Sequence, residues 1–315
     1  MPVDLEAAAA ALEASGDYRV LRRLKAHEAF SPDDGSPKKI AVIVDLETTG
    51  LDASSDEIIE LGMLKFSYGA DGRVHRVLQT YSAFREPQRA IPEEITRLTG
   101  ISPAMVAGKS IDTDAVTTFI EDAVLIIAHN ASFDRPHCER SWPVFSTKHW
   151  GCSSSEVDWH ARGHVGSRLG YLLADYGLFH GSHRALDDCR AVLEILSKAR
   201  PPFVEPPLKT LLDTARLTTV RLWAEGAPFE KKDVLKARGY RWSGIHGAPR
   251  AWWREVAEAD ADTEVRFLRR EIFDDEVIEL PTRRVTALER FAERALVPDL
   301  PMSADMRARH AKLRG

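Results

Sequence analysis

The sequence predicts an α/β protein with a mixed sheet, followed by a second, small α+β domain. Short apolar, β-branched runs at Ile40–Val44 and Val124–Ala128 have the pattern of buried strands. They alternate with segments of helical periodicity, which is typical of an α/β layer architecture. The Pro-Pro pairs at 201–202 and 206–207 then separate this region from a stretch rich in Trp and Arg.

The individual elements follow from apolar spacing and its punctuation. Residues 3–30 are Ala-rich with Leu and Val at helical spacing, which predicts a helical N-terminal extension with a break near Gly16. Asp71-Gly72 between two strand-like runs predicts a hairpin. In chain order, the expected strands are 40–44, 58–68, 74–84 and 124–128, and the expected helices are 91–106 in short pieces, 113–121, 131–140, 168–176 and 184–199.

These elements divide the chain into five expected segments. They are a helical extension at 1–37, the α/β domain at 38–200, a Pro-rich linker at 201–208, the small domain at 209–302 and a polar tail at 303–315.

Composition excludes several classes of protein. Among the 315 residues, no apolar run approaches the roughly 18 residues of a membrane-spanning helix. The start MPVDLE is acidic where a secretory signal is cationic, so we expect a cytoplasmic protein without a membrane partner. The net charge of −5 divides into −7 for residues 1–200 and +2 for residues 201–315.

Two carboxylates mark the end of the first buried strand. Asp45 and Glu47 lie two residues apart, so the period of a strand places both on one face. Like charges this close repel unless a cation lies between them, and Mg²⁺ prefers such oxygen ligands. The following Thr-Thr-Gly offers hydroxyl and N–H groups, although the same residues are typical of a polar turn.

A second polar cluster, His129-Asn130-Ala131-Ser132-Phe133-Asp134, follows the strand at 124–128. Strand ends of this kind often carry the functional groups of α/β proteins. The alternative is structural, with Asn130 or Ser132 capping a helix and Asp134 stabilising its first turn.

The third cluster is His183-Arg184-Ala185-Leu186-Asp187-Asp188. At about 100° per residue, Leu186, Cys189, Leu193 and Leu196 form one apolar stripe. Asp187 falls nearly opposite that stripe and Asp188 falls on its flank, so Asp188 is the aspartate expected to reach a site beneath the helix.

Together the three clusters resemble the motifs of the DnaQ-like 3′–5′ exonucleases, the DEDDh group, which includes the proofreading subunit of bacterial DNA polymerase III. DLETTGLD, HNASFD and HRALDD carry the resemblance, which extends over roughly residues 38–200 and includes IPEEITRLTGIS and SRLGYLLADYGL. It implies a ribonuclease-H-like fold, with a mixed five-stranded sheet flanked by helices. The segment WGCSSSEVDW, with two Trp in ten residues, departs from the family's usual pattern.

The resemblance also assigns roles to individual residues. Asp45, Glu47 and Asp188 would bind one divalent ion, and Asp45, with Asp134 through water, would hold a second; both ions are Mg²⁺ or Mn²⁺. His183 would be the general base. The terminal nucleotide would be gripped by Thr48, Thr49, Gly50 and Leu51, with His129, Asn130 and Phe133 near that pocket.

We therefore expect a 3′–5′ exonuclease that releases nucleoside monophosphates from the 3′ end of nucleic acid. Single-stranded DNA is the favoured substrate. The alternatives are an RNA- or oligonucleotide-directed exonuclease, a proofreading subunit, or a non-catalytic binding subunit; the sequence identifies no protein partner.

The C-terminal part contains a basic, aromatic segment. Lys231–Arg254 holds seven basic residues and one acidic residue. A basic patch with aromatic residues can bind nucleic acid, whereas the alternative is a small domain whose Trp residues form its core. The candidate surface residues are Lys231, Lys232, Lys236, Arg238, Arg241, Trp242, Arg250 and Trp252.

Overall fold

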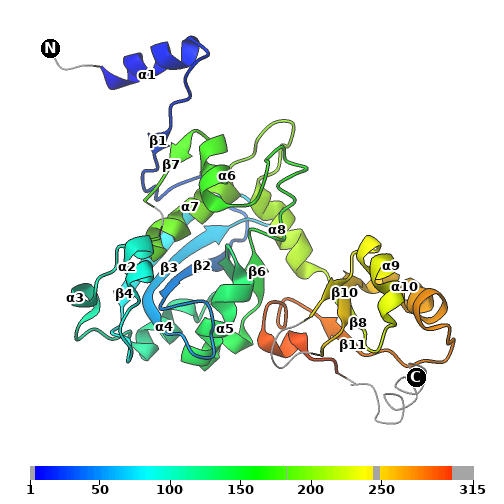
Figure 1. Ribbon diagram of the computed structural model, residues 1–315. Coiled ribbons are helices and arrows are strands. Elements are labelled where there is room, and N and C mark those ends of the chain that lie inside the picture. The colour runs from blue at the N-terminus through cyan, green and yellow to red at the C-terminus, as the bar shows by residue number, and fades with distance from the viewer. Residues whose placement is uncertain (1–3, 182, 244–248, 300–315) are drawn as a thin grey trace. The chain divides into compact units, whose positions relative to one another are not determined.

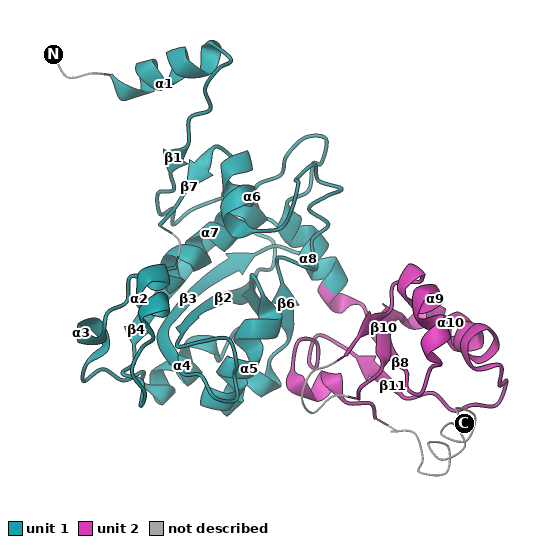
Figure 2. Cartoon of the chain, in the orientation of Figure 1, with its two compact units in different colours: residues 1–214 teal, residues 215–315 magenta. Residues whose placement is uncertain are grey.

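The computed structural model describes residues 4–181, 183–243 and 249–299. The chain forms two compact units, residues 1–214 and 215–315 (Figure 2). The predicted polar tail at 303–315 and the start of the chain at 1–3 lie outside the described residues.

A mixed five-stranded sheet forms the centre of unit 1, in the order β4-β3-β2-β5-β6 (Figure 1). β2 pairs antiparallel with β3, and β3 with β4, whereas β2, β5 and β6 run parallel. This confirms the predicted fold class, a ribonuclease-H-like sheet. The strands are β2 (Lys39–Thr48), β3 (Ile58–Tyr68), β4 (Val74–Phe84), β5 (Leu125–Ala128) and β6 (Trp150–Cys152).

Helices cover both faces of this sheet. On one face Cys189, Val192 and Leu196 of α7 join Ile43 and Phe66 in the main core. On the other face, the Lys65 ammonium lies 5.1 Å from the centroid of the Phe119 ring of α4. The helices are α2 (Glu93–Thr99), α3 (Pro103–Val106), α4 (Thr113–Ile120), α5 (Ala131–Ser141), α6 (Leu169–Asp175) and α7 (Ala185–Ser197), with a 3₁₀ turn at Pro143–Thr147.

The N-terminal extension is helical over less of its length than predicted. Only α1 (Leu5–Ala14) is helical, with its first turn capped by Asp4. Beyond it the chain is extended, and β1 (Arg22–Arg23) pairs parallel with β7 (Leu178–Phe179). Leu24 and Phe30 pack against the main core, so the apolar residues that suggested a helix serve tertiary packing instead.

The break between the units lies after the predicted linker. α8 (Pro207–Arg216) begins inside the segment 201–208, with Pro207 at its first position, where a missing N–H costs nothing. Leu208, Leu211 and Leu212 of α8 are buried in the core of unit 1. Contacts therefore divide the chain after Thr214.

Unit 2 is built on a four-stranded antiparallel sheet in the order β11-β8-β10-β9. The sequence from 231 to 256 predicts a short helix at 231–237, a strand at GYRW, a Gly/Pro turn and a strand at AWWREV, and the structure has this helix and both strands. The strands β8 and β11 and the helix α10 were not predicted, and residues 244–248 of the expected turn lie outside the described ranges. The elements are β8 (Thr219–Ala224), α9 (Lys232–Ala237), β9 (Arg241–Trp242), β10 (Trp252–Ala257), α10 (Ala261–Phe267) and β11 (Thr282–Val285), with 3₁₀ turns at Phe229–Lys231, Glu258–Asp260 and Glu293–Leu296 and a π-helical stretch at Leu268–Phe273.

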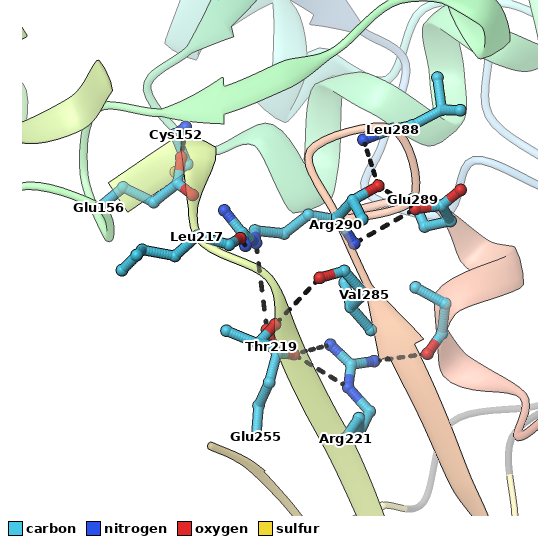
Figure 3. A network of polar contacts seen from close by, with 12 residues as sticks. Cys152, Glu156, Leu217, Thr219, Arg221, Glu255, Val285, Leu288, Glu289 and Arg290 are labelled. Carbon is cyan, nitrogen blue, oxygen red and sulfur yellow. Dashed lines mark hydrogen bonds and ion pairs between the residues drawn. The ribbon is translucent and has the colours of Figure 1, made fainter. Parts of the chain in front are cut away.

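The two faces of this second sheet differ in character. Leu222, Val256 and helix residues such as Leu268 form an apolar core on one face. The other face carries a polar network in which Arg221 forms an ion pair with Glu255, which also accepts a hydrogen bond from Thr219 (Figure 3). In the described part of the chain, no helix is long and apolar enough to cross a membrane.

Candidate active site

The site begins where β2 leaves the core. Asp45 and Glu47 alternate with buried Leu46, so both carboxylates lie on the face that α7 covers. A β-bulge follows directly, between Glu47 and Thr48.

Helix α7 brings a third carboxylate to this strand end. Gly62 of β3, directly opposite Asp45, permits a close approach: a Cβ there would lie 2.5 Å from the backbone nitrogen of Leu186. Ligand atoms of Asp45, Glu47 and Asp188 consequently lie within 4.8 Å of one another. Asp187 is half-exposed and pairs with Arg190, as the helix-face argument predicts.

Asp134 completes the acidic cluster from α5. Its carboxylate is 3% exposed, and its negative charge raises the pKa of Asp45. Sequence analysis grouped these four carboxylates, and the structure brings them into one electrostatic neighbourhood.

Burial without compensation disfavours the charged forms of these groups. Burial, with the charges of Asp134 and Asp188, raises the pKa of Asp45 well above its usual value. Burial and the charge of Asp188 raise the pKa of Glu47 to about 8, and burial raises the pKa of Asp134 to about 8. Among the described residues no Lys or Arg side chain forms an ion pair with any of the four. A hard-oxygen donor set that lacks a cation fits a divalent metal.

Sequence reasoning did not identify Glu60, which is 1% exposed directly opposite Glu47. Both Glu60 oxygens accept from the Arg184 guanidinium at 3.2 Å, and Glu60 also accepts from the backbone N–H of Ala185. This ion pair anchors the start of α7 to β3 and so positions Asp188. A charged residue inside the apolar run of β3 was the available signal.

Two histidines precede α7, and they differ in their contacts. His183, the predicted base, has a left-handed backbone with φ 65°, and none of the described residues hydrogen-bonds its ring. His180, which sequence analysis missed, lies with Nε2 2.7 Å from Oδ1 of Asp188. Asp188 Oδ2 accepts from the backbone N–H of Arg184 at 3.1 Å, so donors fix both of its oxygens.

The turn after β2 is held rigidly by its own side chains. Thr48 Oγ1 donates to the Gly50 carbonyl, and Thr49 Oγ1 accepts from the N–H of Glu57 at 3.0 Å. A Cβ at Gly50 would clash with the Asp56 carboxylate. The Leu51 side chain is 87% exposed and free to contact a ligand.

The residues after β5 take different roles. His129 has both ring nitrogens engaged, Nε2 donating to the Ser167 carbonyl at 2.7 Å and Nδ1 2.8 Å from Ser153 Oγ, so it joins two loops. Asn130 precedes α5 without a side-chain capping bond. Phe133 is half-buried, with its ring centroid 4.8 Å from that of His137.

Comparison with known proteins identifies relatives of unit 1. The RNase T family model, described as an exonuclease, matches residues 42–196. DNA polymerase III subunit epsilon of Treponema pallidum is 30% identical over 164 residues, 49% of this chain and 73% of that protein. The PolC-type DNA polymerase III of Caldanaerobacter subterraneus is 29% identical over 218 residues, 64% of this chain.

The chain spans 15% of the length of that PolC-type polymerase. Among solved structures, exonuclease X in complex with 5′ overhanging duplex DNA aligns with a TM-score of 0.38 and 26% identity, over 49% of this chain and 88% of that one.

Proposed function

The chain belongs to the DnaQ-like exonuclease family, and on that premise we propose that it is a metal-dependent 3′–5′ exonuclease. Its substrate is the 3′ end of single-stranded DNA, from which it releases nucleoside monophosphates. The observation that carries this proposal is the buried cluster of Asp45, Glu47 and Asp188, whose ligand atoms lie within 4.8 Å of one another.

In this proposal Asp45, Glu47 and Asp188 hold one Mg²⁺ or Mn²⁺ ion, and Asp45 and Asp134 hold a second. When bound, two such ions activate water, neutralise the scissile phosphate and stabilise the leaving 3′-oxygen. The raised pKa values of Glu47 and Asp134 support this assignment, because burial disfavours their charged forms and a bound cation would favour them.

His183 accepts the proton of the attacking water. An imidazole titrates near neutral pH, which suits a general base. The ring's freedom from hydrogen bonds to described residues leaves both nitrogens available for this role, and Glu60 and Arg184 fix the start of the helix that follows it.

The rigid turn Thr48–Leu51 grips the terminal nucleotide. Gly50 lets the backbone approach the ligand, and the exposed Leu51 side chain offers an apolar surface to the base or sugar. In this proposal Asn130 and Phe133 also contribute to the nucleotide pocket. His129 supports it indirectly, because both of its ring nitrogens already have partners.

The test uses matched 30-nucleotide DNA and RNA strands, labelled at either end. With Mg²⁺ or Mn²⁺ we expect the 3′-labelled DNA to release labelled mononucleotide at once, and the 5′-labelled DNA to shorten stepwise. EDTA should stop both. If only the RNA strand is degraded, RNA replaces DNA as the substrate. If neither strand releases nucleotides in a metal-dependent way, the proposal is contradicted.

A further inference from the structure

Unit 2 carries a row of exposed and half-buried aromatic rings and lysines along α9 and the edge of its sheet. Neighbouring members of this row either make a short contact or lie one helical turn apart. The Lys232 ammonium lies 4.0 Å from the Phe229 ring centroid, and Lys236 follows one helical turn later. Lys236 lies 5.8 Å from the Trp252 ring centroid, and Trp252 packs edge-to-face on Trp242 at 5.6 Å. We call these five residues the aromatic–lysine row.

The rings at the two ends of the row are accessible. Phe229 is 72% exposed and Trp242 is 54% exposed, although large aromatic side chains usually supply core packing. Within the described ranges, no carboxylate pairs with Lys232 or Lys236. The row therefore presents uncompensated positive charge beside open π faces.

The structure separates this row from the other basic residues of the segment. Arg238 and Arg254 both pair with buried Glu264, and Arg238 also packs over the Phe267 ring at 3.8 Å. Arg241 pairs in register with Trp253, so its side chain belongs to the opposite face of the sheet from Trp242.

Two further candidates stay outside the row. In the described part of the chain, Lys232 and Lys236 lie over rings of the row, whereas Lys231 and the exposed Arg250 make no such contact. Of the eight candidate surface residues predicted from the sequence, four belong to the row: Lys232, Lys236, Trp242 and Trp252. The structure adds Phe229 to them.

We propose that the aromatic–lysine row binds single-stranded nucleic acid. Bases stack on exposed aromatic faces with little regard to sequence, and lysines neutralise phosphates and release their counterions. This inference rests on the proposed function, because the row holds a nucleic-acid strand that the active site of the same chain cuts. Tethering two binding sites raises the effective concentration of the second, so the row favours long substrates over short ones.

Binding is measured first, in EDTA, where no strand is cut. Fluorescence anisotropy of a labelled 30-nucleotide dT strand compares the full-length wild type with Trp242→Ala and with Lys232→Ala/Lys236→Ala. Loss of one stacked base should weaken binding roughly 5- to 150-fold. Loss of two lysines should reduce the slope of log K against log[salt] by about 1.4, at about 0.7 per phosphate contact on a single strand.

Matched variants separate the row from general effects. Trp242→Phe keeps an aromatic face and should retain most of the binding. Arg270→Ala removes an exposed charge of the same unit that pairs with Glu276, and should leave the salt slope unchanged. Hydrolysis of a dinucleotide in Mn²⁺ should proceed at the wild-type rate in every variant.

Unchanged 30-mer affinity and salt slope in Trp242→Ala and the double lysine variant would overturn the proposal and favour a protein-docking surface. Equal losses on the dinucleotide and the 30-mer would also overturn it, because the row would then support the fold. If the wild type cuts neither substrate, the proposed function fails, whereas anisotropy in EDTA still decides whether the row binds DNA.

Discussion

Each unit buries carboxylates, but the acidic cluster of unit 1 differs from Glu264 of unit 2 in how the negative charge is compensated. In unit 2, Glu264 is 4% exposed and accepts hydrogen bonds from Arg238, Arg254 and the Tyr240 hydroxyl. In unit 1, Asp45, Glu47 and Asp134 are gathered without an arginine or lysine partner among the described residues, and the pKa of each is raised.

The comparison separates two uses of a buried acid. A carboxylate that is paired with cations of its own chain is a structural element. Glu264 is of this kind, and its hydrogen bond and charge raise the pKa of Arg238. A carboxylate cluster without such cations is costly to the fold unless a cation arrives from solution. A cation-paired carboxylate stabilises a domain, whereas a cluster without cations fits a metal site.

The largest effect is expected when a carboxylate of the unit 1 cluster is replaced by a neutral side chain. Asp45→Asn should reduce turnover about a thousandfold or more, since metal ions supply several kcal/mol of transition-state stabilisation. Thermal unfolding of the metal-free variant should occur at the same or higher temperature, because an uncompensated buried charge is removed. Asp187→Asn, at the half-exposed neighbour of Asp188, is the control and should retain most activity; wild-type activity in Asp45→Asn would refute the metal assignment.

The proposed general base, His183, is tested next. His183→Ala should lower turnover by roughly 10²–10⁴ while substrate affinity stays near wild type. Products should still shorten from the 3′ end. His160→Ala, at an exposed histidine of the same unit, should act as wild type. An unchanged turnover number at neutral pH would remove His183 from the mechanism.

Glu264 should show the opposite pattern from Asp45. Glu264→Gln leaves two arginines without their carboxylate and should destabilise unit 2 by about 3–5 kcal/mol, as for a broken buried ion pair. Below its unfolding temperature the variant should cut a dinucleotide normally. Glu258→Gln, which breaks an exposed pair with Arg284, should cost little stability in urea unfolding. Equal losses of unfolding free energy in Glu264→Gln and Glu258→Gln would contradict the structural role of Glu264.

His180 sharpens the comparison, because it gives Asp188 a histidine as hydrogen-bond partner where Glu264 has two arginines. His180→Ala should weaken Mn²⁺ binding roughly 10- to 100-fold, the usual cost of removing a group that orients a metal ligand. Calorimetry of Mn²⁺ binding measures this without substrate. A variant that binds Mn²⁺ as tightly as wild type but turns over slowly would instead place His180 in the chemistry.

The last prediction is a pH dependence of stability. The pKa of Glu47 is about 8 in the folded chain, above its usual 4.5, so the folded state holds a proton that the unfolded state has lost between those values. This contribution to stability is present below pH 4.5 and is lost as pH rises toward 8, by at most about 1.4 kcal/mol per pH unit.

Urea unfolding of metal-free wild type and Glu47→Gln across this range measures the difference, and the variant should lose less stability as pH rises. Saturating Mg²⁺ should flatten the wild-type profile. Parallel pH profiles for the two proteins would show that Glu47 keeps an ordinary pKa.

The sequence predicts those parts of the site that local patterns determine. Asp45 and Glu47 share a strand face by the period of two, and helical periodicity selects Asp188 over Asp187. His180 and Glu60 were missed because their roles come from a loop path and a cross-strand position that no local pattern records.

Errors in the fold prediction have the same origin. The helix expected up to residue 30 gives way to β1, whose partner β7 is far away in the chain. Likewise, β8 and β11 are strands because β8 pairs with both β10 and β11, not because their residues alternate clearly.

The pairing of β1 with β7 also sets an order of events during synthesis. Leu178 follows Arg22 by more than 150 residues. At about 5–20 residues per second, the N-terminal segment leaves the ribosome roughly 8–30 s before its partner strand exists. The hairpin of β2 and β3 can form within that interval, since its strands are neighbours in the chain. Arg22 and Arg23 are thus among the last residues of unit 1 to meet their partner strand, after the hairpin of the central sheet can already have formed.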